Sequence, residues 1–354
     1  INAELSLKGV VQSVNFDVKS AAGKVSHKTL WPEPLELGSS QWRGSIDLRD
    51  RKIDFSDIQL NFGSTSAAII AKVNQTDKII SVSSKVKIKH LKVDDIFHLW
   101  PKTKLDNERR WISQNISNGH LSEATVLVKI KLNTLTSQIE FSSVTGNSQI
   151  EGIHIKYMKG APKISNVYGT ATLLTDQVTF NIHRGESLGV VIDKGSVVLS
   201  EVGSQNQNVS VDLVLHGSIK DKLRLIKKLK IGYSKRFSFV PQTFGGTAFT
   251  RLNLRLPVGS EIKNADIKLR IESLTNNASI VGIAAGKDIK DGKFIIKMNL
   301  KGLEVKGDGR VLGAPVKIHW IERFEDNEKY ARRIEAKGVL AQPQWEEFGF
   351  ETFA

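Results

Sequence analysis

Alternation of apolar and polar side chains at a period of two constrains this chain more than any other feature. The segment Val126–Leu132 reads VLVKIKL, so every second residue is apolar and most of the others are lysine. Successive side chains of a strand point to opposite faces, so this pattern predicts a strand with one apolar face. Similar short runs, separated by turn residues, recur along most of the chain. We therefore expect an all-β, mainly antiparallel fold with a few short helices.

The hydrophobic period becomes helical in an insert at about residues 93–118. Asp106 is a suitable N-cap for its main helix, and Gly119 is suited to end that helix in a left-handed conformation. A shorter helix before it should stop at Pro101, because proline cannot continue a helix. A further basic, amphipathic helix is predicted at about residues 220–230, where Leu and Ile side chains share one face.

Composition limits the classes of function. The chain of 354 residues carries a formal net charge of +14 and contains no cysteine, which excludes disulfides and thiolate metal sites. Aromatic residues fall mainly on the apolar side of the predicted strands and no nucleic-acid motif occurs, so we expect no nucleic-acid partner. An anionic membrane surface fits the charge. No apolar run reaches the ~20 residues of a membrane-spanning helix.

The pattern of catalytic residue types argues against an enzyme. The eight histidines are scattered, with no pair at the spacing of metal ligands. The segment Gly185–Gly189 reads GESLG, but no helix is predicted after it, so it lacks the context of a nucleophile elbow. We expect no catalytic residues, no cofactor and no metal. An enzyme acting on a lipid or glycan is the third choice, with His154 and His183 as the positions to test.

The apolar strand faces allow two interpretations. Two sheets can seal them into a sandwich core, or one curled sheet can present them to an apolar ligand such as acyl chains. Periodicity alone does not separate these alternatives. In the second interpretation, the residues that we predict to line the lipid path are Val86, Ile88, Val126, Val128, Ile130, Ile267, Leu269 and Ile271.

Several short motifs resemble those of the AsmA-like superfamily of Gram-negative envelope proteins, specifically its large YhdP-type members. The resemblance covers most of residues 90–325, whereas residues 1–85 share only the general pattern of short alternating strands. The residues of its most distinctive part are Trp100, Pro101, Arg110, Trp111, Asn115, Ile116 and Gly119. Glycine-punctuated strands, such as those around Gly195, Gly307 and Gly309, continue the likeness.

The resemblance implies a long β-sheet, elongated and curled like a taco into an open apolar groove. It also implies a periplasmic location and an anchor in the inner membrane, outside this fragment. Such proteins are thought to carry phospholipids between the inner and outer membranes. We therefore divide the chain into a β-meander at residues 1–85 and a YhdP/AsmA-like region at 86–354. The alternative function is a non-enzymatic scaffold of the cell envelope with a closed β-sandwich core that docks other envelope proteins.

Overall fold

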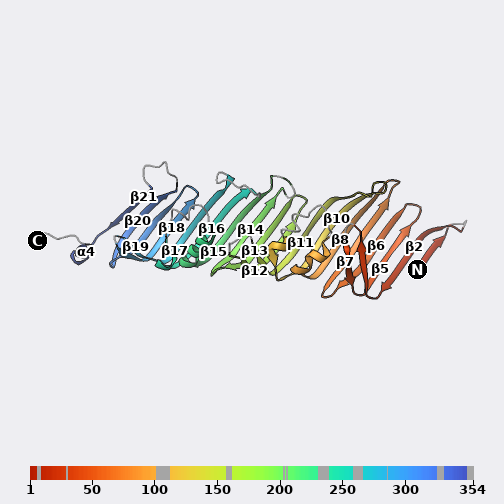
Figure 1. The fold of residues 1–354 in the computed structure, drawn as a ribbon, viewed down its shortest axis with the longest axis horizontal. Coiled ribbons are helices and arrows are strands. Elements are labelled where there is room, and N and C mark those ends of the chain that lie inside the picture. The colour runs from red at the N-terminus through yellow and green to blue at the C-terminus, as the bar shows by residue number, and fades with distance from the viewer. Residues whose placement is uncertain are drawn as a thin grey trace. The chain divides into compact units, whose positions relative to one another are not determined.

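The computed structural model describes residues 1–5, 9–28, 31–100, 112–156, 162–201, 204, 206–229, 239–257, 266–284, 286–324 and 331–348 (Figure 1). Its strands are β1 (Asn2–Leu5), β2 (Val11–Ser20), β3 (Gly23–His27), β4 (Trp31–Leu37), β5 (Ser40–Asp47), β6 (Lys52–Phe62), β7 (Thr65–Gln75), β8 (Ile79–Lys92), β9 (Ile116–Ser117), β10 (His120–Asn133), β11 (Ile139–Ile155), β12 (Ile164–Leu173), β13 (Gln177–Ser187), β14 (Val190–Ser200), β15 (Asn208–Ser218), β16 (Phe244–Pro257), β17 (Lys268–Ala284), β18 (Lys287–Asn299), β19 (Gly302–Val311), β20 (Ala314–Arg323) and β21 (Arg332–Gly338). The helices are η1 (Val93–Asp95), α1 (Ile96–Leu99), α3 (Ile219–Leu229), η3 (Pro241–Thr243) and α4 (Gln342–Glu347).

The prediction of a mainly antiparallel β protein is confirmed. In the described part of the chain, 19 strands belong to one sheet, and β3 and β4 form a separate two-stranded sheet. Contacts divide the chain into two compact units, of which the first consists of residues 1–155, 166–180 and 200–205. The second unit comprises residues 156–165, 181–199 and 206–354. The division at residue 85 rests on the extent of the resemblance and stays a prediction.

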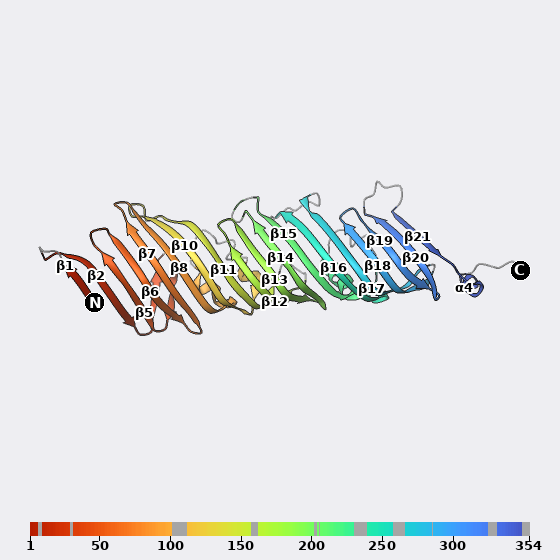
Figure 2. The same ribbon diagram turned by 180° about the vertical axis from the view of Figure 1, so that it is seen from behind.

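Strand order in the first unit follows the sequence closely. Hydrogen-bonded antiparallel pairs connect β1, β2, β5, β6, β7, β8, β10 and β11 in that order. The hairpin of β3 and β4 is an insertion between β2 and β5, and it lies in front of the sheet in Figure 1 and behind it in Figure 2. Proline at positions 32 and 34 provides no ladder donor, which is consistent with the exclusion of β4 from the main sheet.

The second unit contains a meander from β15 to β21, in which each strand pairs with the next one in the sequence. Short connections explain this order, because antiparallel neighbours need only a tight turn. At the turn between β13 and β14, Leu188 and Gly189 both have positive φ. The segment Gly185–Gly189 is therefore part of a β-hairpin, as expected, and no helix follows it.

The helical insert is shorter than the sequence predicts. Helix α1 ends before Pro101 as expected, and residues 112–115 are helical, whereas Asp106 and residues 101–111 lie outside the described residues. The prediction that the helix continues to residue 118 is wrong, because Ile116 and Ser117 form β9, which pairs with β11. Gly119, with φ of 64°, belongs to the turn between β9 and β10 and does not cap a helix.

The other helix predictions agree better with the structure. The helix expected at about residues 220–230 is α3, which begins at Ile219 and ends at Leu229. Ile219 packs against a buried cluster in the second unit, and Phe348, which follows α4, packs against the same cluster. The members of this cluster are Ala278, Ile289, Phe294, Val311, Val316 and Ile318. The two helical segments therefore cover the part of the sheet where the core of the second unit lies.

Candidate functional site: an apolar sheet face

Side chains of like character form rows across the strands of the first unit, because the register places them directly opposite one another. One row runs Val18, Trp42, Ile58, Ile69, Val86, Val126 and Gly146. The next runs Phe16, Gly44, Phe55, Ala71, Ser84, Val128 and Val144, and a third runs Val14, Ile46, Ile53, Val73, Val82, Ile130 and Phe141. We call these three rows the apolar face of the first unit. A one-residue shift in register would move a strand's apolar side chains to the other face.

Aromatic packing determines the local shape of this face. The rings of Phe16 and Phe55 meet edge to face at 5.8 Å, and those of Trp42 and Phe55 at 6.3 Å. Gly44 lies between Phe16 and Phe55 in the ladder, and a Cβ atom there would come within 2.8 Å of the Phe16 ring. The glycine thus leaves the room that the two phenylalanines need.

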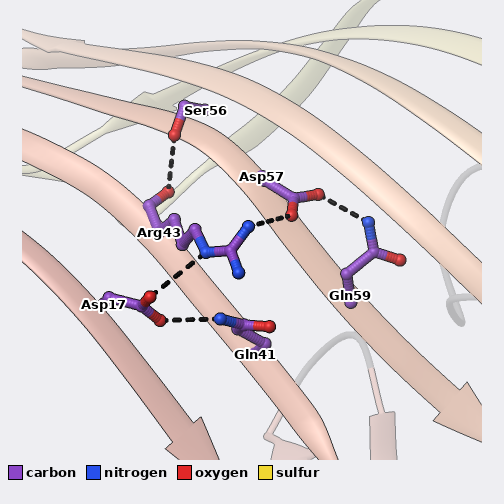
Figure 3. Close-up of polar contacts among 6 residues, drawn as sticks. All are labelled: Asp17, Gln41, Arg43, Ser56, Asp57 and Gln59. Carbon is purple, nitrogen blue, oxygen red and sulfur yellow. Dashed lines mark hydrogen bonds and ion pairs between the residues drawn. The ribbon is translucent and has the colours of Figure 1, made fainter.

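The opposite face of the same strands is polar (Figure 3). Arg43 donates to Asp17 at 3.2 Å and to Asp57 at 3.4 Å, so one guanidinium connects β2, β5 and β6. The hydrogen bond from Gln41, with that from Arg43 as a smaller contribution, lowers the pKa of Asp17 below its ordinary value. These groups are exposed, so their interactions add little to stability. They help to set the register of the strands and keep this face soluble.

Burial of the apolar face changes along the strands. Ile58, Ala67, Leu91 and Ala124 are each at most 7% exposed, and Val93, the first residue of η1, is 2% exposed. Strand β6, which carries Ile58, contacts the hairpin of β3 and β4. The Trp31 indole of this hairpin donates to the Leu99 carbonyl of α1 at 3.1 Å. At the other strand ends, apolar side chains are only half-buried; they include Ile53, Val73, Val82, Ile130 and Phe141. One end of the face is covered, and the other is partly open to solvent.

Strands β15 to β19 of the second unit show a similar gradient, whereas Trp320 and Glu322 of β20 are buried. The buried cluster of this unit lies beneath Ile219 and Phe348, while toward the other strand ends a row of apolar side chains crosses β15 to β19. This row consists of Leu213, Leu252, Ile271, Met298 and Leu303. All of these except Leu213 are half-buried. A further pair, Leu254 and Leu269, continues the same face beyond it.

The structure brings some of the predicted lining residues together and separates others. Val86 lies directly opposite Val126, and Ile88 opposite Ala124, on adjacent strands. All five predicted residues of the first unit are half-buried and lie on its apolar face or continue it. The other three, Ile267, Leu269 and Ile271, belong to the second unit, and Ile267 lies just before the first residue of β17. Contact with lipid stays a prediction for all of them.

The family-motif residues have a structural environment where they are described. Trp100 has an extended backbone after α1, and Asn115 is the last residue of the helical turn at 112–115. Gly119 approaches β11 so closely that a Cβ atom would overlap the backbone of Glu151 and Gly152. Pro101, Arg110 and Trp111 lie outside the described residues.

Three histidines each pair with one carboxylate. The pairs are His216 with Asp193 at 2.5 Å, His120 with Glu151 at 3.1 Å and His319 with Glu304 at 2.9 Å. Hydrogen bonds from Lys306 and then His319 lower the pKa of Glu304. Within the described ranges, no group of three or more His, Cys, Asp or Glu side chains is arranged to hold a metal ion.

Sequence reasoning missed two charged groups on the apolar face of the second unit. Glu322 is buried and accepts hydrogen bonds from the Trp320 indole at 2.9 Å and from Arg332 at 2.7 and 3.1 Å. Its bonds to the guanidinium raise the pKa of Arg332. Lys222 reaches the face from α3 and contacts Thr250. Each of the two residues occupies a position at which the strand or helix period is otherwise apolar. This departure from the period is the signal by which the sequence could have identified them.

These features define a class of protein: a large antiparallel β protein whose main sheet, in the described ranges, has one mainly polar face and one apolar face with many half-buried side chains. The family model described as YhdP protein matches residues 2–348, so the chain belongs to the YhdP family. No curated protein and no solved structure matches the chain. None of the helices in the described ranges has both the length and the hydropathy needed to cross a membrane.

Proposed function

We propose that this chain is a segment of a lipid-transfer protein of the bacterial envelope, in which the apolar face shields phospholipid acyl chains. The observation that carries the proposal is the half-buried apolar surface at one end of the strands in each unit. Each methylene group removed from water contributes about 0.8 kcal/mol, so this surface suits an acyl chain better than water. Polar headgroups would stay in solvent beyond the strand ends.

Membership of the YhdP family supports this proposal, together with the periplasmic location and inner-membrane anchor that we infer from the resemblance. The partners in this account are phospholipids and a membrane surface. No catalytic residue and no cofactor is required, because the chains would move along a passive surface. The net charge of +14 would favour anionic headgroups near the protein.

The test uses two adjacent residues on opposite faces of β10. Val128 belongs to the apolar face, whereas Leu127 is 48% exposed on the other side of the strand. We expect native mass spectrometry and lipid extraction to find phospholipid on the purified chain. Val128→Asp should reduce the bound lipid about tenfold, because a carboxylate is costly to desolvate. Leu127→Asp should retain it.

Circular dichroism of both variants shows whether the β structure of the chain is retained. Loss of lipid in a folded Val128→Asp protein, with retention in Leu127→Asp, supports the proposal. Absence of lipid from the wild-type chain, or equal retention in both variants, contradicts it.

A scaffold that docks other envelope proteins is the second candidate, and one observation favours it. Phe249, Leu274 and Ile295 are 54%, 59% and 53% exposed and lie directly opposite one another on the polar face of β16, β17 and β18. Such an apolar strip on a polar face is typical of protein interfaces. In the described ranges only β3 and β4 lie outside the main sheet, so a sandwich core would have to form within that sheet.

A further inference from the structure

Three polar side chains meet on the apolar face of the second unit, where α3 covers it. The Lys222 ammonium donates to the Leu215 carbonyl at 3.0 Å and to Thr250 Oγ1 at 2.7 Å. Thr250 Oγ1 lies 2.7 Å from Ser273 Oγ on the adjacent strand. Thr250 is only 7% exposed, so this is a built polar site within an apolar surface. We call Lys222, Thr250 and Ser273 the polar cluster.

The ammonium of Lys222 has no carboxylate partner within the described ranges. Asp221, its neighbour in α3, accepts from Ser218 at 2.6 Å and pairs with Arg224 at 3.2 Å. Asp193 pairs with His216 at 2.5 Å and acts on Lys222 only through its longer-range field. Burial lowers the pKa of Lys222 to about 8. A half-buried cation without a counter-ion costs free energy, and an incoming anion would remove that cost.

Apolar side chains lie next to the polar cluster, toward the open strand ends. Leu252 and Ile271 each stand two residues along their strands from Thr250 and Ser273, on the same face. Two residues of a strand span about 7 Å. Met298 and Leu303 extend this apolar row across the next two strands. An anionic group at the polar cluster would therefore have a surface for an attached hydrocarbon chain beside it.

We propose that the polar cluster binds the phosphate or carboxylate of an anionic amphiphile whose chain lies on the row formed by Leu252, Ile271, Met298 and Leu303. This inference rests on the proposed function and adds a preference to it: the face selects amphiphiles by charge at one defined position. The Lys222 ammonium retains one N–H for the anion, and the Ser273 hydroxyl can donate a second hydrogen bond.

The elements packed against α3 add few competing charges. Helix η3 and residues 244–250 of β16 contain no titratable side chain. On β15, His216 is engaged with Asp193. On α3 itself, Lys220 and Arg224 add positive charge, and Asp221 is bonded to Ser218 and Arg224. The titration that decides anion binding near pH 8 is therefore that of Lys222.

Calorimetric titration of the delipidated 354-residue chain with three probes tests the proposal. The probes are dodecyl phosphate, dodecanol and inorganic phosphate. At pH 7 we expect dodecyl phosphate to bind at least about tenfold more tightly than dodecanol, which corresponds to 1.4 kcal/mol. Inorganic phosphate should bind far more weakly than dodecyl phosphate. The preference for the charged probe should decline as the pH rises above 8, because Lys222 then loses its proton.

Two variants of α3 locate the effect. Lys222→Met keeps the apolar stem without the charge and should abolish the preference for dodecyl phosphate. Lys222→Arg keeps the charge and should retain most of the preference. Lys227→Met removes an exposed charge from the same helix and should leave the preference unchanged. Thermal unfolding of each variant confirms that α3 and the sheet remain folded.

The outcomes separate the two proposals. Equal binding of dodecanol and dodecyl phosphate, or a preference that persists in Lys222→Met, overturns the polar cluster as an anion site and leaves the proposed function standing. If inorganic phosphate binds as tightly as dodecyl phosphate, the polar cluster is a simple anion site. That result contradicts the proposed contact between the hydrocarbon chain of the amphiphile and the apolar row. Binding of neither dodecanol nor dodecyl phosphate contradicts the proposed function as well.

Discussion

Lys222 and Glu322 show how differently two charges are accommodated on one apolar face. Glu322 accepts three hydrogen bonds from Trp320 and Arg332, and the guanidinium lies 5.6 Å from the centre of the Trp320 ring. Lys222 has a carbonyl and a hydroxyl as partners, and no carboxylate among the described residues pairs with it. The first charge is compensated within the fold, whereas the second is compensated only in part.

The lowered pKa of Lys222 has a consequence for stability. In the unfolded chain the pKa returns to its ordinary value of 10.5, compared with about 8 in the folded state. Between these values the unfolded chain binds more protons, so the free energy of unfolding rises as the pH increases from 8 to 10.5. The gain is on the order of 2 kcal/mol.

We therefore expect Lys222→Met to be at least as stable as the wild type at pH 7. Its free energy of unfolding should also lack the rise that the wild type shows between pH 8 and 10. Urea denaturation of both proteins at pH 7, 8, 9 and 10 measures this difference. Parallel pH profiles would show that Lys222 titrates normally and would contradict its half-buried, unpaired state.

At the scale of elements, the turn between β9 and β10 depends on one glycine. Gly119 has a φ of 64°, and a Cβ atom there would overlap the backbone of β11. Gly63, in the turn between β6 and β7, has a φ of 60° but nothing within 4 Å of the same position. The two glycines share a left-handed backbone conformation, which would strain a side-chain-bearing residue, and they differ in the space around them.

Gly119→Ala should therefore cost about 3 kcal/mol or more, since conformational strain and overlap with β11 add. Gly63→Ala should cost about 1 kcal/mol, from the strain alone. Urea denaturation of the two variants beside the wild type gives both values. Equal losses of stability would mean that β9 and β11 are not in close contact at Gly119.

Sequence reasoning succeeded where one physical signal dominated. Alternation at a period of two predicted β8 and β10 with the correct side chains on each face, because burial of one face determines the register. It failed at residues 116–117, where β9 depends on pairing with β11, a contact that the local period does not encode. Whether the apolar face is covered also depends on distant segments, such as the contact of Trp31 with Leu99.

The position of Lys222 was accessible to sequence reasoning and was overlooked. At 100° per residue, Lys222 falls inside the apolar arc of α3, between Leu229 and Ile226. A lysine there must either reach past the apolar surface or meet polar groups on it. Thr250 and Ser273 provide those groups, but their strands follow α3 at a distance in the sequence, so only the fold shows the meeting.

At the scale of the whole molecule, we propose that acyl chains bind to the apolar face in both units and not to the polar face. The apolar rows of the first unit, and those of β15 to β19 in the second, are buried toward one strand end and mostly half-buried toward the other. The absence of cysteine allows single labels to be placed at chosen positions. Two pairs of residues are suitable, because Val128 and Ile271 belong to apolar faces, while Leu127 and Leu274 are exposed on polar faces.

The most direct measurement is fluorescence quenching of a dye attached to each single-cysteine variant by a phospholipid that carries a nitroxide on its acyl chain. The variants are Val128→Cys, Ile271→Cys, Leu127→Cys and Leu274→Cys. We expect strong quenching at positions 128 and 271 and little at 127 and 274. Equal quenching on both faces, or stronger quenching at 127 and 274, would contradict the claim that the apolar face binds the lipid.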